Sequence, residues 1–211
     1  MRHGRGECSW LVFVDLLRVA NLVCGALVAK GGMFMKIRCV VTGQTASGKS
    51  VIAKDSQVEP VTLETVPGFE FHRVWGGESV PQLPSDGTPT AHPRYFPPAG
   101  GYRFYFYVVP PDERLRSAYR DVAASLVEMQ VKLPGMAETL DLAQRGMHTT
   151  DTVDFDVVIS GEVYLQVDDG AEVLLKAGDC VIQNGTRHAW HNRSTENCLV
   201  AVAIVGATRG S

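Results

Sequence analysis

The last third of the chain constrains the fold most, because it contains short apolar runs at close, even intervals. "DFDVVISGEVYLQV" (154–167) and "AEVLLKAG" (171–178) are joined by "DDG", and three more runs, "DCVIQN", "HAWHN" and "CLVAVAIVG", follow in residues 179–206. Asp-Gly tolerates the positive φ values that a tight hairpin turn needs. Many short strands separated by glycine-bearing turns are typical of an all-β sandwich or a small barrel.

The region before it also consists mainly of predicted strands. β-branched and aromatic runs occupy residues 36–42, 50–55, 61–66, 69–75 and 102–109. The Pro- and Gly-rich residues 76–101 predict a loop. A single amphipathic helix is indicated by an apolar stripe of Leu115, Tyr119, Val122, Leu126, Met129 and Leu133. Pro134-Gly135 should end it.

Residues Gly43 to Ser50 read "GQTASGKS", which has the G-x-x-x-x-G-K-S spacing of a phosphate-binding loop. Such a loop needs a helix that begins at its Lys-Ser, so that the helix N-terminus faces the phosphates. Here a β-branched run, "VIAKDSQVEP", follows and is stopped by Pro60. The alternating strands and helices of a parallel sheet are also missing from the sequence pattern. We therefore interpret "TASGKS" as a hairpin turn and expect no bound nucleotide.

The composition argues against binding to nucleic acid or membranes through overall charge. The 211 residues carry 20 Lys and Arg against 23 Asp and Glu, a net charge of −3. Such a chain attracts neither nucleic acid nor an anionic membrane. Its five cysteines, Cys8, Cys24, Cys39, Cys180 and Cys198, include no C-x-x-C pair. We expect buried thiols in a reducing compartment, and hence a cytoplasmic location.

The first 35 residues differ from the rest. The apolar run from Trp10 to Ala29 resembles a secretory signal, but Asp15, Arg18 and Asn21 interrupt it and no clean cleavage site follows. As a membrane span it is also poor, because a buried Asp or Arg costs roughly 2.5–3.5 kcal/mol. We interpret residues 1–35 as a loosely attached extension or a start placed too early, with a membrane anchor as the alternative.

Three histidines fall in the regular C-terminal region. His148, Thr150 and Asp154 lie at even separations, so in extended chain they share one face. His188 lies in "GTRHAWHN", and a hairpin-rich barrel could bring it opposite His148. His191 has odd parity relative to His188, so on a regular strand it would face away.

The two histidine-bearing segments resemble the paired motifs of the cupin superfamily, small β-barrels with a ligand pocket in the mouth. The first motif is matched by His148, Thr150, Asp154 and Gly161, and the second by Gly178, Gln183, Gly185, His188 and Asn192, one residue short between Gly178 and Gln183. From about Arg38 the chain is similar to a subgroup of single-domain bacterial and fungal cupins, through "YFPPAGGYRF" and "LPGMAET" among other segments. Several fungal members of this subgroup lie in polyketide-type secondary-metabolite gene clusters and are described as cupin oxidoreductases.

The resemblance implies an all-β fold, a cupin (double-stranded β-helix or jelly-roll) barrel. Its core would span residues 146–208, with a β extension at 36–110 and a helical connection at 111–145 that crosses outside the barrel. Cupins of this size commonly pair through sheet edges, which also covers the exposed edge strands. We therefore expect a homodimer.

The resemblance also implies a site. In metal-dependent cupins two His and a Glu of the first motif and the His of the second bind Fe, Mn, Ni or Zn. Here Thr150 replaces the second His and Asp154 replaces the Glu, which leaves His148, Asp154 and His188 as a two-His-one-carboxylate set. The alternative is a polar pocket without a metal.

Catalysis without a metal is open to the same residues. Asp154 and His148 could shuttle protons, and Asp156, which shares the strand parity of Asp154, could act as a general base in an apolar pocket. We expect an enzyme that tailors a small molecule in secondary metabolism by metal-assisted oxidation, by decarboxylation, or by isomerisation or dehydration. The alternative is a non-catalytic cupin that binds a small molecule as a sensor or carrier.

Overall fold

The computed structural model describes residues 35–116 and 121–210. The expected N-terminal extension and Tyr119 of the predicted helical stripe lie outside these residues. Among the described residues, no helix combines the length and the apolar character needed to cross a membrane. The cytoplasmic location and the division into domains stay predictions.

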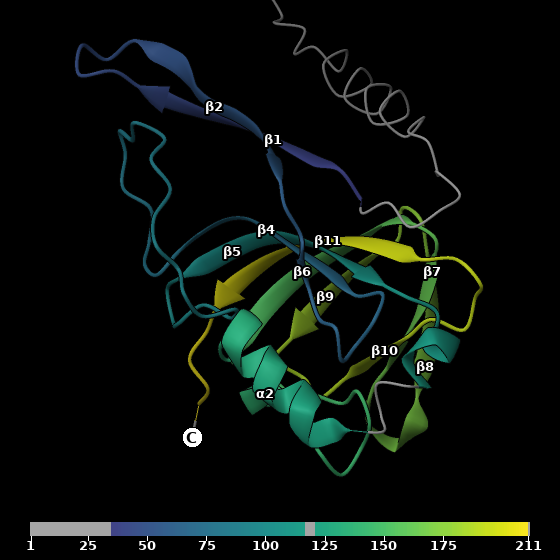
Figure 1. Ribbon diagram of the computed structural model, residues 1–211. Coiled ribbons are helices and arrows are strands. Elements are labelled where there is room, and N and C mark those ends of the chain that lie inside the picture. The colour runs from purple at the N-terminus through teal and green to yellow at the C-terminus, as the bar shows by residue number, and fades with distance from the viewer. Residues whose placement is uncertain (1–34, 117–120, 211) are drawn as a thin grey trace, which may run out of the picture. The chain divides into compact units, whose positions relative to one another are not determined.

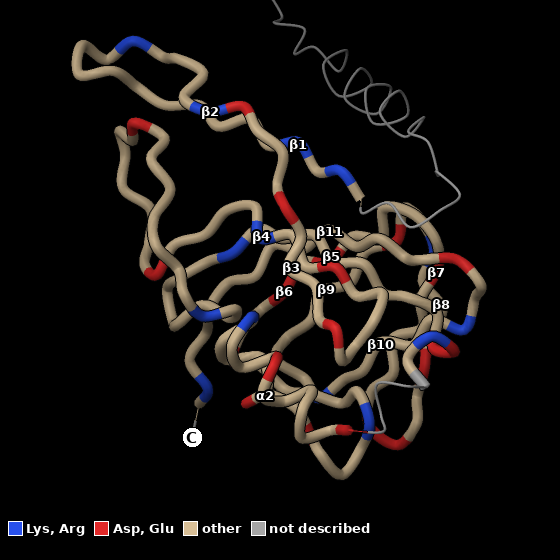
Figure 2. The backbone as a smooth tube through the Cα atoms, viewed as in Figure 1, with Lys and Arg blue, Asp and Glu red and all other residues tan. Residues whose placement is uncertain are grey.

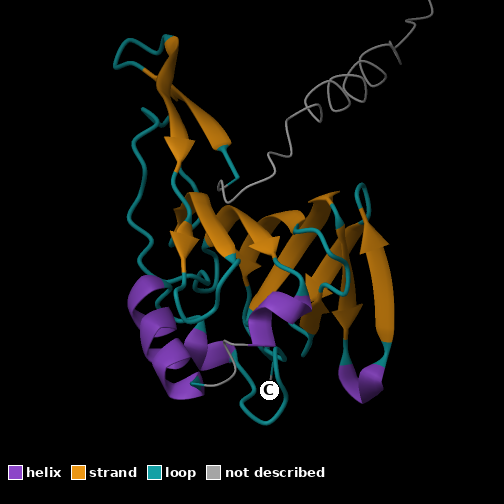
Figure 3. Cartoon of the chain, turned by 45° about the vertical axis from the view of Figure 1, so that its right-hand side comes forward, coloured by secondary structure: helices purple, strands orange, loops and turns teal. Residues whose placement is uncertain are grey.

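Two antiparallel sheets form the body of the fold (Figures 1 and 3). The larger sheet has the order β3-β4-β5-β11-β6-β9, and the smaller has the order β10-β7-β8. In the larger sheet the strands are β3 (Val61–Thr62), β4 (Glu70–Gly77), β5 (Tyr102–Val109), β11 (Cys198–Gly206), β6 (Thr152–Ser160) and β9 (Cys180–Asn184). In the smaller they are β10 (Ala189–His191), β7 (Glu162–Gln166) and β8 (Glu172–Lys176). The all-β prediction is confirmed, with the N-terminal strands β3–β5 extending the sheet of β6, β9 and β11.

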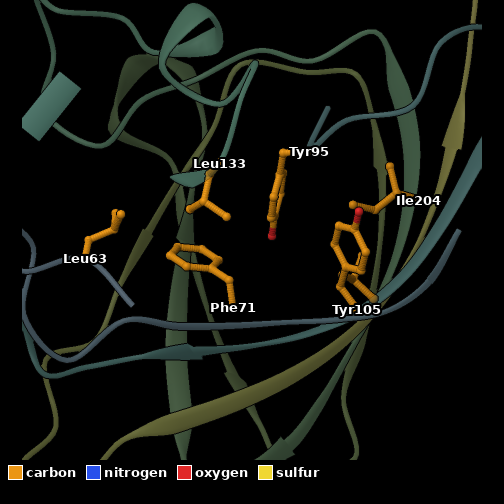
Figure 4. Close-up of a cluster of buried hydrophobic side chains, with 7 residues drawn as sticks. Leu63, Phe71, Tyr95, Tyr105, Leu133 and Ile204 are labelled. Atoms are coloured by element: carbon orange, nitrogen blue, oxygen red, sulfur yellow. The ribbon is translucent and has the colours of Figure 1, made fainter. Parts of the chain in front are cut away.

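The core joins the two sheets. Val158 and Val200 of the larger sheet belong to the same buried cluster as Val163, Leu165 and Leu175 of the smaller one. A second cluster lies where the helix meets the larger sheet. Figure 4 shows the Tyr95 ring between Phe71 and Tyr105, with Leu133 above Phe71. Two apolar clusters therefore stabilise the barrel, one between the two sheets and one between the larger sheet and the helix.

The apolar run 154–167 splits at Gly161 into β6 and β7, which lie in different sheets. Gly161 has φ of 78°, and a Cβ there would come within 2.6 Å of the Asn197 carbonyl oxygen. A residue with a side chain would therefore be strained at this corner. The expected "DDG" turn is confirmed, and Asp169 and Gly170 both adopt positive φ, 58° and 75°.

The region "GQTASGKS" is a hairpin turn, as predicted from its β-branched continuation. It joins β1 (Ile37–Gln44) to β2 (Ser50–Val58), and the Thr45 N–H donates to the Lys49 carbonyl oxygen at 2.9 Å. Ser50 begins a strand, where a phosphate loop would have the first residues of a helix.

The described residues contain one α-helix, α2 (Val122–Lys132), which begins later than the predicted stripe. Leu115 lies instead in the short 3₁₀ helix η1 (Asp112–Arg116). Asp121 caps α2 by accepting from the Ala124 N–H at 2.9 Å, and the helix ends just before Pro134 as expected. Two more short 3₁₀ helices, η3 (Ala137–Thr139) and η4 (Asp168–Gly170), complete the elements.

The prediction of a strand over residues 61–66 is wrong beyond Thr62. The backbone N–H groups of Glu64 and Thr65 donate to the Glu128 carboxylate of α2, at 2.8 and 2.9 Å. These hydrogen bonds replace strand pairing and link α2 to the segment that follows β3.

Charged residues occur mainly on the hairpin, the loops and α2 (Figure 2).

Candidate functional site

A cavity of about 870 Å³ lies between the two sheets and α2. Its wall combines aromatic and aliphatic side chains with a few polar groups. The aromatic part is Phe69, Phe71, Tyr95, Phe96, Tyr107 and Trp190, and the polar part includes His148, Asp154, Asp156 and His188. A volume of this size holds a drug-sized organic molecule. All the site residues predicted from the sequence reach this one cavity.

His148 and His188 form a close pair. An isolated antiparallel bridge joins their backbones, and their ring centroids are 4.1 Å apart. Nδ1 of His148 lies 3.1 Å from the Gly146 carbonyl oxygen, and Nδ1 of His188 lies 2.9 Å from that of Thr186. Each Nδ1 therefore carries the proton and donates, which leaves each Nε2 with a free lone pair.

Burial keeps both imidazoles neutral. It lowers the pKa of His148, and it lowers the pKa of His188 to about 4, an effect to which the neighbouring His148 adds. Neutral imidazoles accept protons or bind metals through nitrogen, whereas the charged form does neither.

Asp154 and Asp156 lie two residues apart on the inward face of β6, as their parity predicted, and are 8% and 5% exposed. Burial raises the pKa of Asp154 to about 6. Burial and then the charge of Asp154 raise the pKa of Asp156 to about 7, against the opposing effect of the Tyr107 hydroxyl, which donates to Oδ1 of Asp156 at 3.0 Å. Both carboxyl groups can therefore exchange protons near neutral pH.

Asp154 has one oxygen without a protein partner. Its Oδ1 is buried and accepts no hydrogen bond. Gln183 lies directly opposite on β9, and its Nε2 is the other buried side-chain atom without a partner in the described residues. A buried unpaired polar atom costs roughly 1–3 kcal/mol, so such atoms in a cavity wall indicate a bound group.

The predicted metal set is only partly assembled. His148 and His188 offer two free Nε2 atoms, which suits a divalent metal. However, the described residues contain no group of three or more His, Cys, Asp or Glu arranged to hold a metal ion. Thr150 at the position of the missing histidine accepts a hydrogen bond from Thr152 Oγ1 at 2.8 Å. The His148, Asp154 and His188 donors do not fit a three-ligand site here, and we derive no step through a metal.

Other polar residues have structural partners. Strand parity predicted that His191 faces away from His188, but both line the cavity, because His188 lies just before β10 and not on a regular strand. Nε2 of His191 hydrogen bonds Oε1 of Gln166 at 2.9 Å. His72 is fully buried on β4 beside Glu70, with Nε2 3.2 Å from Oε2 of that carboxylate.

Three aromatic residues that line the cavity were not among the site residues predicted from the sequence. Tyr107 hydrogen bonds Asp156, Trp190 packs edge-on against His188 at 5.9 Å between centroids, and Tyr95 reaches the cavity from the loop before β5. The alternation of "YRFYFYVV" could have placed Tyr105 and Tyr107 on one face. Tyr95 begins the segment "YFPPAGGYRF" that carries part of the resemblance, but the pattern of this segment predicts only a loop and does not place the side chain.

Comparison with known proteins agrees with the fold. Residues 143–205 match the family described as "Cupin domain". The chain is 41% identical over 69 residues to phomopsin biosynthesis cluster protein C' of Diaporthe leptostromiformis, which covers 30% of this chain and 36% of that protein. It is 53% identical over 57 residues to oryzines biosynthesis cluster protein J of Aspergillus oryzae, 27% of this chain and 32% of that protein.

A third similarity is to the cupin-domain-containing oxidoreductase virC of Hypocrea virens, 37% identical over 46 residues, 22% of this chain and 24% of that protein. The chain thus spans between about a quarter and about a third of the length of the curated relatives it matches. The two-sheet barrel with its internal cavity is a cupin fold, and residues 143–205, which contain both histidines, match the cupin domain.

Proposed function

We propose that the protein is an enzyme that moves protons on a small molecule inside the barrel, as an isomerase or dehydratase does. The observation that carries this proposal is the pair of carboxyl groups, Asp154 and Asp156, buried side by side on the inward face of β6 in a largely apolar cavity. Burial there raises their pKa values to about 6 and about 7. General acids and bases work best when their pKa lies near the working pH.

The chemistry assigns separate roles to the groups. As a carboxylate, Asp156 removes a proton from a carbon next to a carbonyl, and the carbonyl oxygen takes the electron pair as an enolate. In an isomerisation the protonated Asp156 returns that proton at a different carbon, or a protonated Asp154 supplies its own proton there. In a dehydration it protonates the departing hydroxyl, which leaves as water. Neutral His148 is a second acceptor through Nε2.

The relatives support a role in secondary metabolism. Two are named as proteins of the phomopsin and oryzines biosynthesis clusters. The substrate in this proposal is therefore a small secondary metabolite or its precursor.

Solvent deuterium exchange on a panel of carbonyl compounds tests the proposal. Ketones, enones and β-hydroxy carbonyl compounds are each incubated with the protein in D₂O, and NMR follows loss of the C–H signal next to the carbonyl. We expect exchange with at least one compound, and an Asp156→Asn variant should slow it about a hundredfold. Asp169→Asn, in the turn between β7 and β8, is the matched control because it removes one carboxylate outside the cavity. Exchange that survives in Asp156→Asn would overturn the proposal.

The His148–His188 pair favours a second candidate, a metal-dependent oxidoreductase in which these residues bind Fe, Mn, Ni or Zn and other ligands come from outside the protein. The name of the virC relative supports this candidate. Metal analysis of protein purified without chelator or nickel resin tests it. A full equivalent of metal in the wild-type protein that is lost in His188→Ala would favour this candidate over the acid–base proposal. So would oxidation that the metal-free wild-type protein regains when Fe(II) is added. Tight binding of a compound with neither exchange nor oxidation would favour the non-catalytic sensor or carrier.

We also propose that two copies of the chain pair, through the outer face of the larger sheet and not through the sheet edges that the resemblance led us to expect. This outer face is defined by outward side chains of four neighbouring strands: Phe104, Phe106, Ala201, Ala203, Val205, Val153, Phe155, Val157, Ile159 and Ile182. Six of them are large apolar residues that are 36–52% exposed. Monomers rarely expose so continuous an apolar surface. Because the face bears no charge, a two-fold axis can set it against itself without like charges meeting.

A further inference from the structure

The cavity contains far more negative than positive charge. Five acidic residues line it, Asp112, Glu113, Asp141, Asp154 and Asp156, and Arg145 is the single Lys or Arg among its described lining residues. Arg187 pairs with Asp141 at 2.6 Å. Asp154 and Asp156 lie deeper, and neither has a cationic partner in the described part of the chain. The two histidines near them are neutral. The inner wall is therefore anionic once these carboxyl groups are ionised.

Asp154 supplies an independent sign of a ligand. The side chain is more than nine-tenths buried and lines the cavity, and its Oδ1 accepts no hydrogen bond. A buried carboxylate oxygen is stabilised most by a donor that also carries a positive charge. Gln183 Nε2 opposite is a neutral donor and would leave the charge uncompensated.

The surrounding side chains suit the same kind of group. Phe71, Tyr95, Tyr107 and Trp190 all line the cavity, and Figure 4 shows the Tyr95 ring running from its loop toward the sheet. The faces of aromatic rings attract cations, with a gain of about 0.5–2 kcal/mol for an ammonium group within reach. An anionic ligand would meet like charge, whereas a neutral one would use only the aromatic surface.

From these observations we infer that the cavity recognises a protonated amine on an apolar or aromatic body, with the ammonium group donating to Oδ1 of Asp154. This inference rests on the proposed function only in that both concern the same cavity. It adds the chemical class of the substrate that the proposed enzyme would bind. Asp154 is then the anchor that orients the substrate, and Asp156, held by Tyr107, is left for proton transfer.

Binding of three probes of one shape tests the inference. 2-Phenylethylamine, 2-phenylethanol and 3-phenylpropionate differ mainly in the terminal group. Each is titrated into the protein by NMR at about pH 8 in buffer with EDTA, where both carboxyl groups are ionised and the amine is protonated. We expect the amine to bind about tenfold or more tightly than the alcohol, and the carboxylate to bind most weakly.

Two variants locate the effect. Asp154→Asn should weaken amine binding about tenfold and leave alcohol binding unchanged, whereas the control Asp169→Asn should change neither. Thermal unfolding of each variant verifies that it is folded. If Asp154→Asn does not fold, Asp154→Glu takes its place. This variant should change the affinity for the amine without changing the affinity for the alcohol. Equal affinities for the amine and the alcohol, an unchanged Asp154→Asn or the absence of amine binding would each overturn the inference.

The outcome is separate from that of the proposed function. Amine binding needs no turnover, so a protein that binds the amine but catalyses no deuterium exchange would retain the amine site and lose the acid–base enzyme. Exchange on neutral ketones together with no preference for the amine would do the reverse.

Discussion

Strand β6 carries Thr152, Asp154 and Asp156 on the face that lines the cavity, whereas Val153, Phe155 and Val157 lie on the outer face. In an ordinary two-layer β fold the inner residues are apolar and the outer ones polar. Here the middle of the strand has the opposite pattern, and only Val158 at its end packs in the core. Each face is therefore unfavourable in isolated protein, the inner one because it buries charge and the outer one because it exposes apolar surface.

The two proposals together account for this difference between the faces of β6, since each supplies a binding partner for one of them. The polar inner face is suited to a ligand that compensates buried carboxylates, and the apolar outer face is suited to another protein surface. Both statements can be tested by changing one face and leaving the other intact.

The largest effect should come from placing a charge on the outer face. Phe155 is 45% exposed at the centre of that face, and Phe155→Asp would bury two carboxylates at a two-fold contact. We expect the dissociation constant of the dimer to rise about a hundredfold or more, because unpaired interface charges cost several kcal/mol. Analytical ultracentrifugation over a range of concentrations measures it.

Val173→Asp is the matched control for this experiment. Val173 is 49% exposed on β8 of the smaller sheet and lies outside the outer face. Its substitution should leave the dimer unchanged. A wild-type protein that sediments as a monomer at all concentrations would refute the paired outer faces.

A smaller effect is expected on the inner face, in the dependence of stability on pH. The folded pKa values of Asp154 and Asp156, about 6 and about 7, lie above the ordinary value of 3.8. Between about pH 4 and about pH 7 the folded state therefore binds more protons than the unfolded state, and these residues make stability fall as pH rises. The penalty is absent at lower pH and constant at higher pH.

The doubly substituted variant Asp154→Asn/Asp156→Asn should lack this penalty. Relative to wild type it should gain about 3 kcal/mol in unfolding free energy between about pH 5 and about pH 6.5, where both residues titrate in the folded state, as measured by urea unfolding. The lowered pKa of His188 acts in the opposite direction over part of this range, and because it is common to both proteins the difference between them isolates the carboxyl groups. Parallel stability curves for the two proteins would show that the carboxyl groups are not perturbed.

Sequence patterns were reliable where they depend on local geometry. The alternation along β6 correctly put Asp154 and Asp156 on one face, and the β-branched residues after Lys49 identified a hairpin in place of a phosphate loop. The cupin motifs brought His148 and His188 together, and their backbones are indeed bridged.

The rest depends on contacts between distant segments. Parity places His148 and Asp154 on a common face but does not bring their side chains close together, because six residues of extended chain span roughly 20 Å. Strand pairing over 61–66 was overridden by Glu128, a residue more than sixty positions away, and the environment of Asp156 depends on Tyr107. Neither contact leaves a trace in the local sequence.

The smallest effect should come from Tyr107, whose hydroxyl donates to Asp156 across the intervening strand β11. This hydrogen bond favours the ionised carboxylate and so lowers its pKa against the effect of burial. In Tyr107→Phe the pKa of Asp156 should therefore rise by about one unit, equivalent to about 1.4 kcal/mol. The acidic limb of the pH profile for deuterium exchange should move to higher pH by the same amount, while the maximum rate changes little. Tyr164→Phe, on β7 beside Arg193, is the control and should leave the profile in place. A Tyr107→Phe profile that coincides with that of wild type would mean that Asp156 is not the group that titrates, and would transfer the role of base to Asp154 or His148.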